Sequence, residues 1–295
     1  MQAIASWLVA RPHNAIAVLA ATLVLPFRTM TSGATLVLLI LHSGIQKASL
    51  YAAIAATFVL GVGYVSGMPV TIFLATTAAI WVPIGLLALM LRTTRSLTLT
   101  LQVSVMVAMA AIVTFYVALD DPAAVGRSWL EQMIAYFNEA GNHGQAKMLA
   151  DNREELAPLV TLFMVLGVWL VYVMVLMFGY ALFRSLPGQS AAFGRFCDLN
   201  FGRVLALIAA AVLLLSMASD MMLLEQLAVM VVAAFSVQGL SLVHWLQVER
   251  GLPMLVVMVV YVLLMPLAAV FGPLLAMAGY ADAWLDLRSK LARKT

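Results

Sequence analysis

The stretch from Pro158 to Phe183 contains twenty-six residues without one Asp, Glu, Lys, Arg or His. About 20 apolar residues are enough for a helix to cross the hydrocarbon core of a bilayer, which is about 30 Å thick. Inside lipid the peptide groups of a segment must find their hydrogen-bond partners within it, as they do in a helix. The stretch therefore predicts a transmembrane helix.

Composition extends this prediction to the whole chain. Of its 295 residues, 64% are hydrophobic and 10% are charged, whereas soluble domains carry about 25% charged residues. So few charges could not cover the surface of a soluble protein, so 1–295 is predicted to be a single integral membrane domain. The bases lie in short loops between apolar runs, which indicates a lipid bilayer as the partner and no nucleic acid. The single cysteine, Cys197, excludes an internal disulfide.

The predicted fold class is all-α, a polytopic integral membrane helical bundle with about eight to ten membrane helices, some of them short or broken. Residues 48–91 carry no charge, but glycines and Pro69 divide them into two spans. Arg28 to Gly33 interrupt the first apolar region, so its two short segments can form a hairpin, a tilted pair or a re-entrant element. Besides Pro158–Phe183, the predicted spans are Ala15–Phe27, Ala34–Gln46, Ser49–Val65, Pro69–Leu91, Leu97–Leu119, Val204–Ser219 and Gln226–Val248.

The uncharged run 251–281 has two interpretations. As one helix it would put the basic tail outside the cell, against the tendency of basic segments to stay in the cytoplasm. As two helices that turn near Pro266, each about 21–27 Å long at about 1.5 Å per residue, it would return the tail to the cytoplasm. We favour the two-helix interpretation.

The charges of the loops predict an orientation. Segment 120–157 has a net charge of −4, and the rest of the chain has +7. Segment 184–203 has three arginines and one acid, and the tail 282–295 is also basic. Basic segments stay in the cytoplasm, so 120–157 is predicted to be extracytoplasmic, and both termini cytoplasmic.

The long segment 120–157 is predicted to contain an amphipathic helix. Ser128 and Glu131 have the spacing of a capping box. The apolar residues that follow at helical spacing on one face are Trp129, Met133, Tyr136 and Phe137. Gly141 to Gly144 end the helix by turn chemistry. The helix can lie at the outer membrane–water interface or act as a lid over an outward-facing site.

A set of polar residues with a spacing of three lies in the span before Glu249: Gln238, Ser241, His244 and Gln247. They drift slowly around one helix face. Polar groups inside a membrane are costly and tend to face the bundle interior. They can line a small-molecule site, or they can hydrogen-bond to neighbouring helices, with His244 and Gln247 near the cytoplasmic interface.

Arg28 belongs to a second polar group, with His42, Gln46 and Lys47 near the short early segments. An arginine in a broken membrane segment can meet an anionic ligand at a helix N-terminus. It can equally extend to the lipid headgroups.

The last predicted membrane exit carries Asp282, Trp284, Asp286 and Arg288. These residues can form a cytoplasmic docking surface for a partner, or anchor the topology with Trp284 at headgroup level. Asp282 and Arg288 are poorly spaced for a pair on one helix, so we expect Arg288 to contact a neighbouring helix or a lipid phosphate.

No catalytic motif is present in the sequence. It lacks GxSxG, HExxH and Walker A sequences, and its four histidines lie in four different segments. We therefore expect no enzyme activity, no catalytic residues, no metal and no cofactor.

Four features together resemble the YybS-like family of bacterial polytopic membrane proteins. They are the glycine-rich early spans, the run Gln238–His244, the tripeptide Gly251–Pro253, and the ending Ala278–Arg288 with its Gly-x-x-Asp-x-x-x-Asp-x-Arg pattern. The resemblance extends from about Ala15 to the tail and leaves out 120–157. It implies a multi-pass protein of the bacterial cytoplasmic (inner) membrane. That family is similar, at a remote level, to the substrate-binding S components of energy-coupling-factor transporters.

Two functions are consistent with these features. The first is a transport subunit that binds a small-molecule ligand and works with membrane or ATPase partner subunits, since the chain has no nucleotide motif of its own. The second is a non-transporting interaction or assembly protein that contacts its partners through loop 120–157 and the C-terminal tail.

Overall fold

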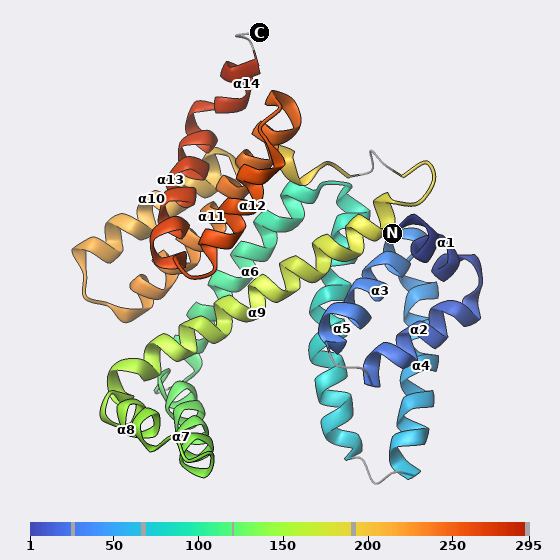
Figure 1. The fold of residues 1–295 in the computed structure, drawn as a ribbon, viewed down its shortest axis with the longest axis horizontal. Helices are drawn as coiled ribbons and strands as arrows, with labels where there is room; N and C mark the ends of the chain where they lie inside the picture. Colours follow the sequence, from blue (N-terminus) through green and yellow to red (C-terminus); the bar gives the residue numbers. More distant parts are fainter. Residues whose placement is uncertain (25–26, 66–68, 120, 190–192, 293–295) are drawn as a thin grey trace. The chain divides into compact units, whose positions relative to one another are not determined.

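The structure is a computed structural model that describes residues 1–24, 27–65, 69–119, 121–189 and 193–292. These residues form fourteen α-helices and one 3₁₀ turn and contain no strand, which confirms the all-α class (Figure 1). The chain divides into two compact units. Unit 1 comprises Met1–Leu101 and Leu170–Phe196, and unit 2 comprises Gln102–Trp169 and Cys197–Thr295.

Six helices in the described part of the chain are long and apolar enough to cross a membrane. They are α4 (Ile45–Val65), α5 (Val70–Thr94), α6 (Leu97–Ala118), α9 (Arg153–Arg184), α11 (Met222–Arg250) and α13 (Ala268–Leu285). Helix α9 includes the whole charge-free stretch from Pro158. By helix length and hydropathy, the chain is a polytopic membrane protein.

The number of spans exceeds six if any of three further apolar elements also crosses the membrane. Helices α1 (Gln2–Ala10) and α2 (Pro12–Val24) would make a seventh span if the pair, bent by 113°, crosses as one. The bend lies at Arg11, which is extended because a residue before proline avoids the helical region. Helices α10 (Gly202–Ala218) and α12 (Met254–Leu264) are apolar but shorter.

Helix α3 (Arg28–Ser43) is the centre of unit 1. Every residue from Ser32 to Leu41 is buried, because α2, α4, α5 and the last turns of α9 surround it. A Cβ at Gly179 of α9 would lie 2.7 Å from the Ala34 carbonyl oxygen of α3. Only glycine permits this approach between the two backbones.

The prediction that Arg28 to Gly33 interrupt the helical region is wrong. These residues form the first turns of α3. The Thr31 hydroxyl bonds back to the Phe27 carbonyl at 3.2 Å, and Ser32 accepts a 2.7 Å hydrogen bond from Trp81 Nε1 on α5. Polar side chains satisfied in this way are compatible with a buried helix.

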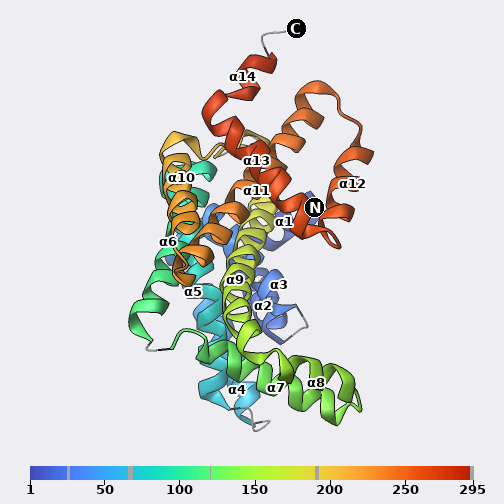
Figure 2. The same ribbon diagram turned by 90° about the vertical axis from the view of Figure 1, so that its left-hand side faces the viewer.

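The run 251–281 forms two helices, as the two-helix interpretation predicts. Helix α12 ends at Leu264, a turn covers 265–267, and α13 begins at Ala268. The two run side by side in opposite directions (Figure 2). Helix α12 is shorter than predicted, since its eleven residues extend only about 17 Å at about 1.5 Å each.

Segment 120–157 contains two helices of unit 2, α7 (Ala124–Glu139) and α8 (His143–Asp151). The predicted capping box is wrong because α7 begins at Ala124, so Ser128 lies inside the helix. The predicted end is correct, since α7 stops at Glu139 and Gly141 has a φ of +77°. Helix α8 was not predicted.

The predicted apolar face of α7 is only partly buried. Trp129 and Tyr136 are exposed and Met133 and Phe137 are half-buried, whereas Gly126 and Leu130 are buried. A Cβ at Gly126 would lie 1.9 Å from the Ala157 carbonyl oxygen, so α7 packs directly on the backbone of α9. Ion pairs of Arg127 with Asp121 and Glu154 reinforce this contact.

Candidate functional site

Four segments of unit 2 meet at a set of buried polar side chains. Gln238 and Ser241 come from α11, Asp282 from the last turn of α13, and Arg288 from α14 (Leu287–Ala292). We call these four residues the buried polar cluster. The fourth segment, 197–201, begins within the 3₁₀ turn Phe196–Asp198 and supplies backbone groups. Gln238, Ser241 and Asp282 have no exposed surface, and Arg288 is 9% exposed.

Gln238 uses both ends of its side-chain amide. Its Oε1 accepts a 2.8 Å hydrogen bond from the backbone amide of Phe201. Its Nε2 donates to the Gly279 carbonyl at 2.9 Å and to Asp282 Oδ2 at 3.3 Å. The residue therefore joins α11 to both α13 and segment 197–201.

Arg288 joins α14 to the same segment. Its Nη1 donates to the Cys197 carbonyl at 2.5 Å, and its Nη2 donates to the Leu199 carbonyl at 2.7 Å and to Ser241 Oγ at 2.8 Å. Ser241 in turn donates to the Leu199 carbonyl at 3.0 Å. The planar guanidinium suits this role because its donors are fixed in a fork.

Asp282 and Arg288 form a buried ion pair, which the sequence analysis did not expect. Arg288 Nε lies 3.1 Å from Asp282 Oδ2, without the alignment of a hydrogen bond. The spacing rule for one helix does not apply here, because α13 ends at Leu285 and Asp286 adopts a left-handed conformation with a φ of 48°. This break turns the chain so that Arg288 points back at Asp282. Of the two contacts expected for Arg288, the structure shows the one with a neighbouring helix, through Ser241 of α11.

Most polar atoms of the cluster are hydrogen-bonded within the fold. The exceptions among the described residues are Asp282 Oδ1 and Arg288 Nε, which are buried without a hydrogen-bond partner. Burying two ions costs free energy that only good geometry and extra hydrogen bonds offset. The arrangement favours the interhelical hydrogen-bond interpretation of Gln238 and Ser241.

The other predicted residues of this region lie outside the cluster. His244 Nε2 lies 3.0 Å from the hydroxyl of Tyr261 on α12. Gln247 is half-buried farther along α11, and Asp286 is exposed. Trp284 packs edge-on against Tyr280, with 6.2 Å between the ring centres. Of the four polar residues predicted to share a face of this helix, Gln238 and Ser241 therefore lie in the cluster, and His244 and Gln247 do not.

Gly239 and Gly279 set the position of α13 on α11. Their packing role was not predicted from the sequence. A Cβ at Gly239 would lie 1.9 Å from the Leu275 carbonyl oxygen, and one at Gly279 would lie 2.3 Å from the Phe235 carbonyl oxygen. Small residues allow such backbone contacts between membrane helices. This close approach brings Gln238 within reach of Gly279 and Asp282. The available signal in the sequence was a glycine inside each of two apolar helices, Gly239 and Gly279.

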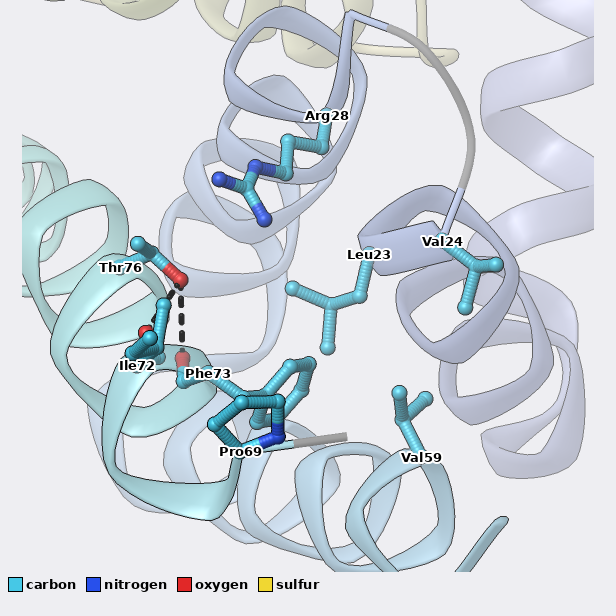
Figure 3. A pocket seen from close by; sticks show the side chains of 8 residues that line it. All are labelled: Leu23, Val24, Arg28, Val59, Pro69, Ile72, Phe73 and Thr76. Atoms are coloured by element: carbon cyan, nitrogen blue, oxygen red, sulfur yellow. Dashed lines mark hydrogen bonds between the residues drawn. The ribbon is translucent and has the colours of Figure 1, made fainter. Parts of the chain in front are cut away.

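Unit 1 contains a half-open cavity of about 290 Å³ beside Arg28. Its lining residues come from the end of α2, the start of α3, α4 and the first turns of α5 (Figure 3): Leu23, Val24, Arg28, Val59, Pro69, Ile72, Phe73 and Thr76. Arg28 is the only charged residue among them. The Thr76 hydroxyl is bonded to the carbonyls of Ile72 and Phe73 at 2.9 and 3.0 Å.

The structure separates Arg28 from the residues grouped with it in the sequence. Arg28 begins α3 and His42 lies in its last turn, about 21 Å apart at about 1.5 Å per residue. Gln46 and Lys47 follow in the first turn of α4. At the C-terminal end of α3, near His42, the charged partner is Arg92 of α5. Its guanidinium donates hydrogen bonds to the Ile40 and Leu41 carbonyls.

In the described part of the chain, no group of three or more His, Cys, Asp or Glu residues is arranged to hold a metal ion. No protein-family model, no curated protein and no solved structure matches the chain.

Proposed function

We propose that this polytopic membrane protein is a small-solute-binding transport subunit of the bacterial inner membrane, related to the YybS-like family and resembling the S components of energy-coupling-factor transporters. The observation that supports the proposal is the cavity of about 290 Å³ with Arg28 as its only charged lining residue. Ligand sites are concave and mostly apolar, with a few polar groups that orient the ligand.

The cavity is a better solute site than the buried polar cluster. The cluster's side chains are bonded to one another and to segment 197–201, so a ligand there would have to displace interhelical hydrogen bonds. Arg28, in contrast, is exposed, and its side chain has no hydrogen bond or ion pair among the described residues. Of the five ligand-binding residues proposed from the sequence, we retain Arg28.

Transport would require further subunits. The sequence contains no Walker A motif, so ATP hydrolysis would have to come from an ATPase partner. In this proposal the exposed Lys290 of α14 faces that partner in the cytoplasm.

The proposed topology has both termini in the cytoplasm and segment 120–157 outside. It uses ten spans, namely the six long helices, the bent pair α1–α2, and the shorter helices α3, α10 and α12, and this even number returns the C-terminus to the side of the N-terminus. To test it, the native cysteine is removed by Cys197→Ala and single cysteines are placed by Gly144→Cys, Pro187→Cys or Lys290→Cys, all at exposed positions. In intact cells a membrane-impermeant maleimide is expected to label the Gly144→Cys protein alone. Labelling of the Lys290→Cys protein without lysis would contradict the proposal.

Co-purification tests the solute site. The protein purified in a mild neutral detergent is expected to carry a stoichiometric small molecule in native mass spectrometry. Val59→Trp should remove it, because Val59 is 5% exposed at the floor of the cavity and the indole would fill that space. Val62→Trp on the exposed face of the same helix is the matched control and should retain it. A preparation of wild-type protein without any bound small molecule would count against the proposal.

An assembly protein is the second candidate. It is favoured by the exposed Trp129 and Tyr136 on α7 and by the anchoring of the C-terminal segment through Arg288. Purification of the protein with a stoichiometric protein partner and no small molecule would support this candidate instead. Contacts of the partner would then be expected on α7, α8 and the tail.

A further inference from the structure

We infer that the cavity beside Arg28 binds an acyl chain with an anionic head group, with the head on the guanidinium and the chain against the apolar wall. This inference rests on the proposed solute site and names its ligand class. The two sources of this chemistry are a free fatty acid and an anionic bilayer lipid.

The wall of the cavity is suited to an acyl chain. Leu23, Val59 and Phe73 are 4–5% exposed and form its buried part. Val24 and Ile72 are 71% and 61% exposed and form part of its rim. Among the described lining residues, Thr76 is the only one with an uncharged polar side chain, and its hydroxyl proton is used within α5. A hydrophilic solute would therefore find few partners in the cavity besides Arg28.

Arg28 supplies the charge that selects an anion. Figure 3 shows its side chain on the opposite side of the cavity from Pro69 and Phe73. No acid lines the cavity, and the guanidinium has no partner among the described residues. A cation at an apolar surface is stabilised by a counter-charge, and a carboxylate or phosphate matches the guanidinium fork. Arg28 is also the first residue of α3, which begins without a side-chain cap, so the helix dipole adds to the positive charge.

The depth of the cavity along α4 points to a ligand from the lipid phase. Val59 lines the cavity, but α4 continues for six residues to Val65, which is about 9 Å at about 1.5 Å per residue. Val62 and Val65 beyond it are 55% and 86% exposed. At Val59 the cavity therefore lies about two turns before the end of α4. The exposed apolar surface of α4 beyond it would face acyl chains in a membrane. An amphiphile can reach it from the bilayer.

The size of the cavity limits how much of the ligand it encloses. At about 290 Å³ it is at the lower end of the range for ligand pockets, about 300–1,000 Å³. It can hold a short chain or the part of a longer chain next to the head group. The rest of a long chain would extend past the exposed rim into the bilayer.

Decanoate, decanol and acetate separate the contributions of charge and chain. Each is titrated into full-length protein in a neutral detergent, and bound ligand is counted by native mass spectrometry. Decanoate is expected to bind at least about tenfold more tightly than decanol, as expected for hydrogen bonds to a charged group, while acetate should not bind measurably. Arg28→Gln should remove the preference for decanoate and Arg28→Lys should keep it. Arg11→Gln, which changes an arginine outside the cavity, is the matched control.

Reconstitution distinguishes the two sources. The protein is placed in nanodiscs of phosphatidylcholine with a minor fraction of phosphatidylglycerol, with and without decanoate, and the lipids that remain bound after extraction are identified. If phosphatidylglycerol stays bound to the wild type but not to the Arg28→Gln protein, the ligand is a bilayer lipid. If decanoate displaces the phosphatidylglycerol, the ligand is a free acid. Both outcomes support the inference. Equal binding of decanoate and decanol would overturn it. A co-purified solute that is not an amphiphile and is lost in Val59→Trp would overturn this inference and leave the proposed function standing.

Discussion

Replacing Arg288 with methionine is expected to destabilise the protein by about 3–5 kcal/mol, the usual cost of removing one partner of a buried ion pair. The substitution leaves the Asp282 carboxylate in a site with no exposed surface. It also removes the hydrogen bonds from Arg288 to the Cys197 and Leu199 carbonyls, so segment 197–201 loses its attachment to α14. The measurement is the shift of the unfolding midpoint in mixed micelles of dodecyl maltoside and SDS.

Two further variants make this prediction specific. Lys290→Met removes an exposed cation from the same short helix and should change stability by less than about 0.5 kcal/mol, as surface substitutions usually do. Asp282→Asn combined with Arg288→Met should cost less than the sum of the two single changes, because the double variant buries no unpaired charge. Additive effects would mean that Asp282 and Arg288 do not act as a pair.

Replacing Gly239 with alanine is expected to destabilise the protein by about 1–3 kcal/mol, the usual effect of overpacking a close contact. The new Cβ would lie 1.9 Å from the Leu275 carbonyl oxygen, which is backbone and cannot move aside alone. Helix α13 would have to shift away from α11, and Gln238 would lose its contacts with Gly279 and Asp282. The same unfolding assay measures this effect.

Gly272→Ala is the matched control on the partner helix. Its Cβ would meet only Ser236 Oγ at 3.9 Å, an ordinary contact. Alanine favours a helix over glycine by about 0.5–1 kcal/mol, so this variant should be neutral or slightly more stable than the wild type. If both variants had the same effect, the backbone contact at Gly239 would not be what holds the two helices together.

The long helices were predictable because a bilayer imposes a length and excludes charge. Pro69–Leu91 and Leu97–Leu119 differ from α5 and α6 by a few residues at their ends. The turn near Pro266 was also predictable, since the basic tail required an even number of crossings. The first prediction rested on the apolar pattern, and the second rested on the charge of the tail.

The ion pair of Asp282 with Arg288 could not be predicted by helical spacing, because a single left-handed residue at Asp286 changes which side chains meet. The role of segment 197–201 was also hidden, since its backbone carbonyls carry no sequence signal. Arg28 was singled out as a residue of a broken region, whereas it begins α3, and the cavity beside it depends on α4 and α5, which only the fold brings together.

Segment 197–201 has a consequence for the order in which unit 2 can form. The hydrogen bond from Arg288 to the Cys197 carbonyl joins residues separated by 91 positions. During synthesis, α10 to α13 must all be made before the guanidinium exists. Until then the Cys197 carbonyl lacks this donor, whereas the Leu199 carbonyl can already accept its hydrogen bond from Ser241 of α11. Contacts between distant parts of a chain form late because loop closure costs entropy. The last helix to be made therefore completes the hydrogen bonds of a turn that was made four helices earlier.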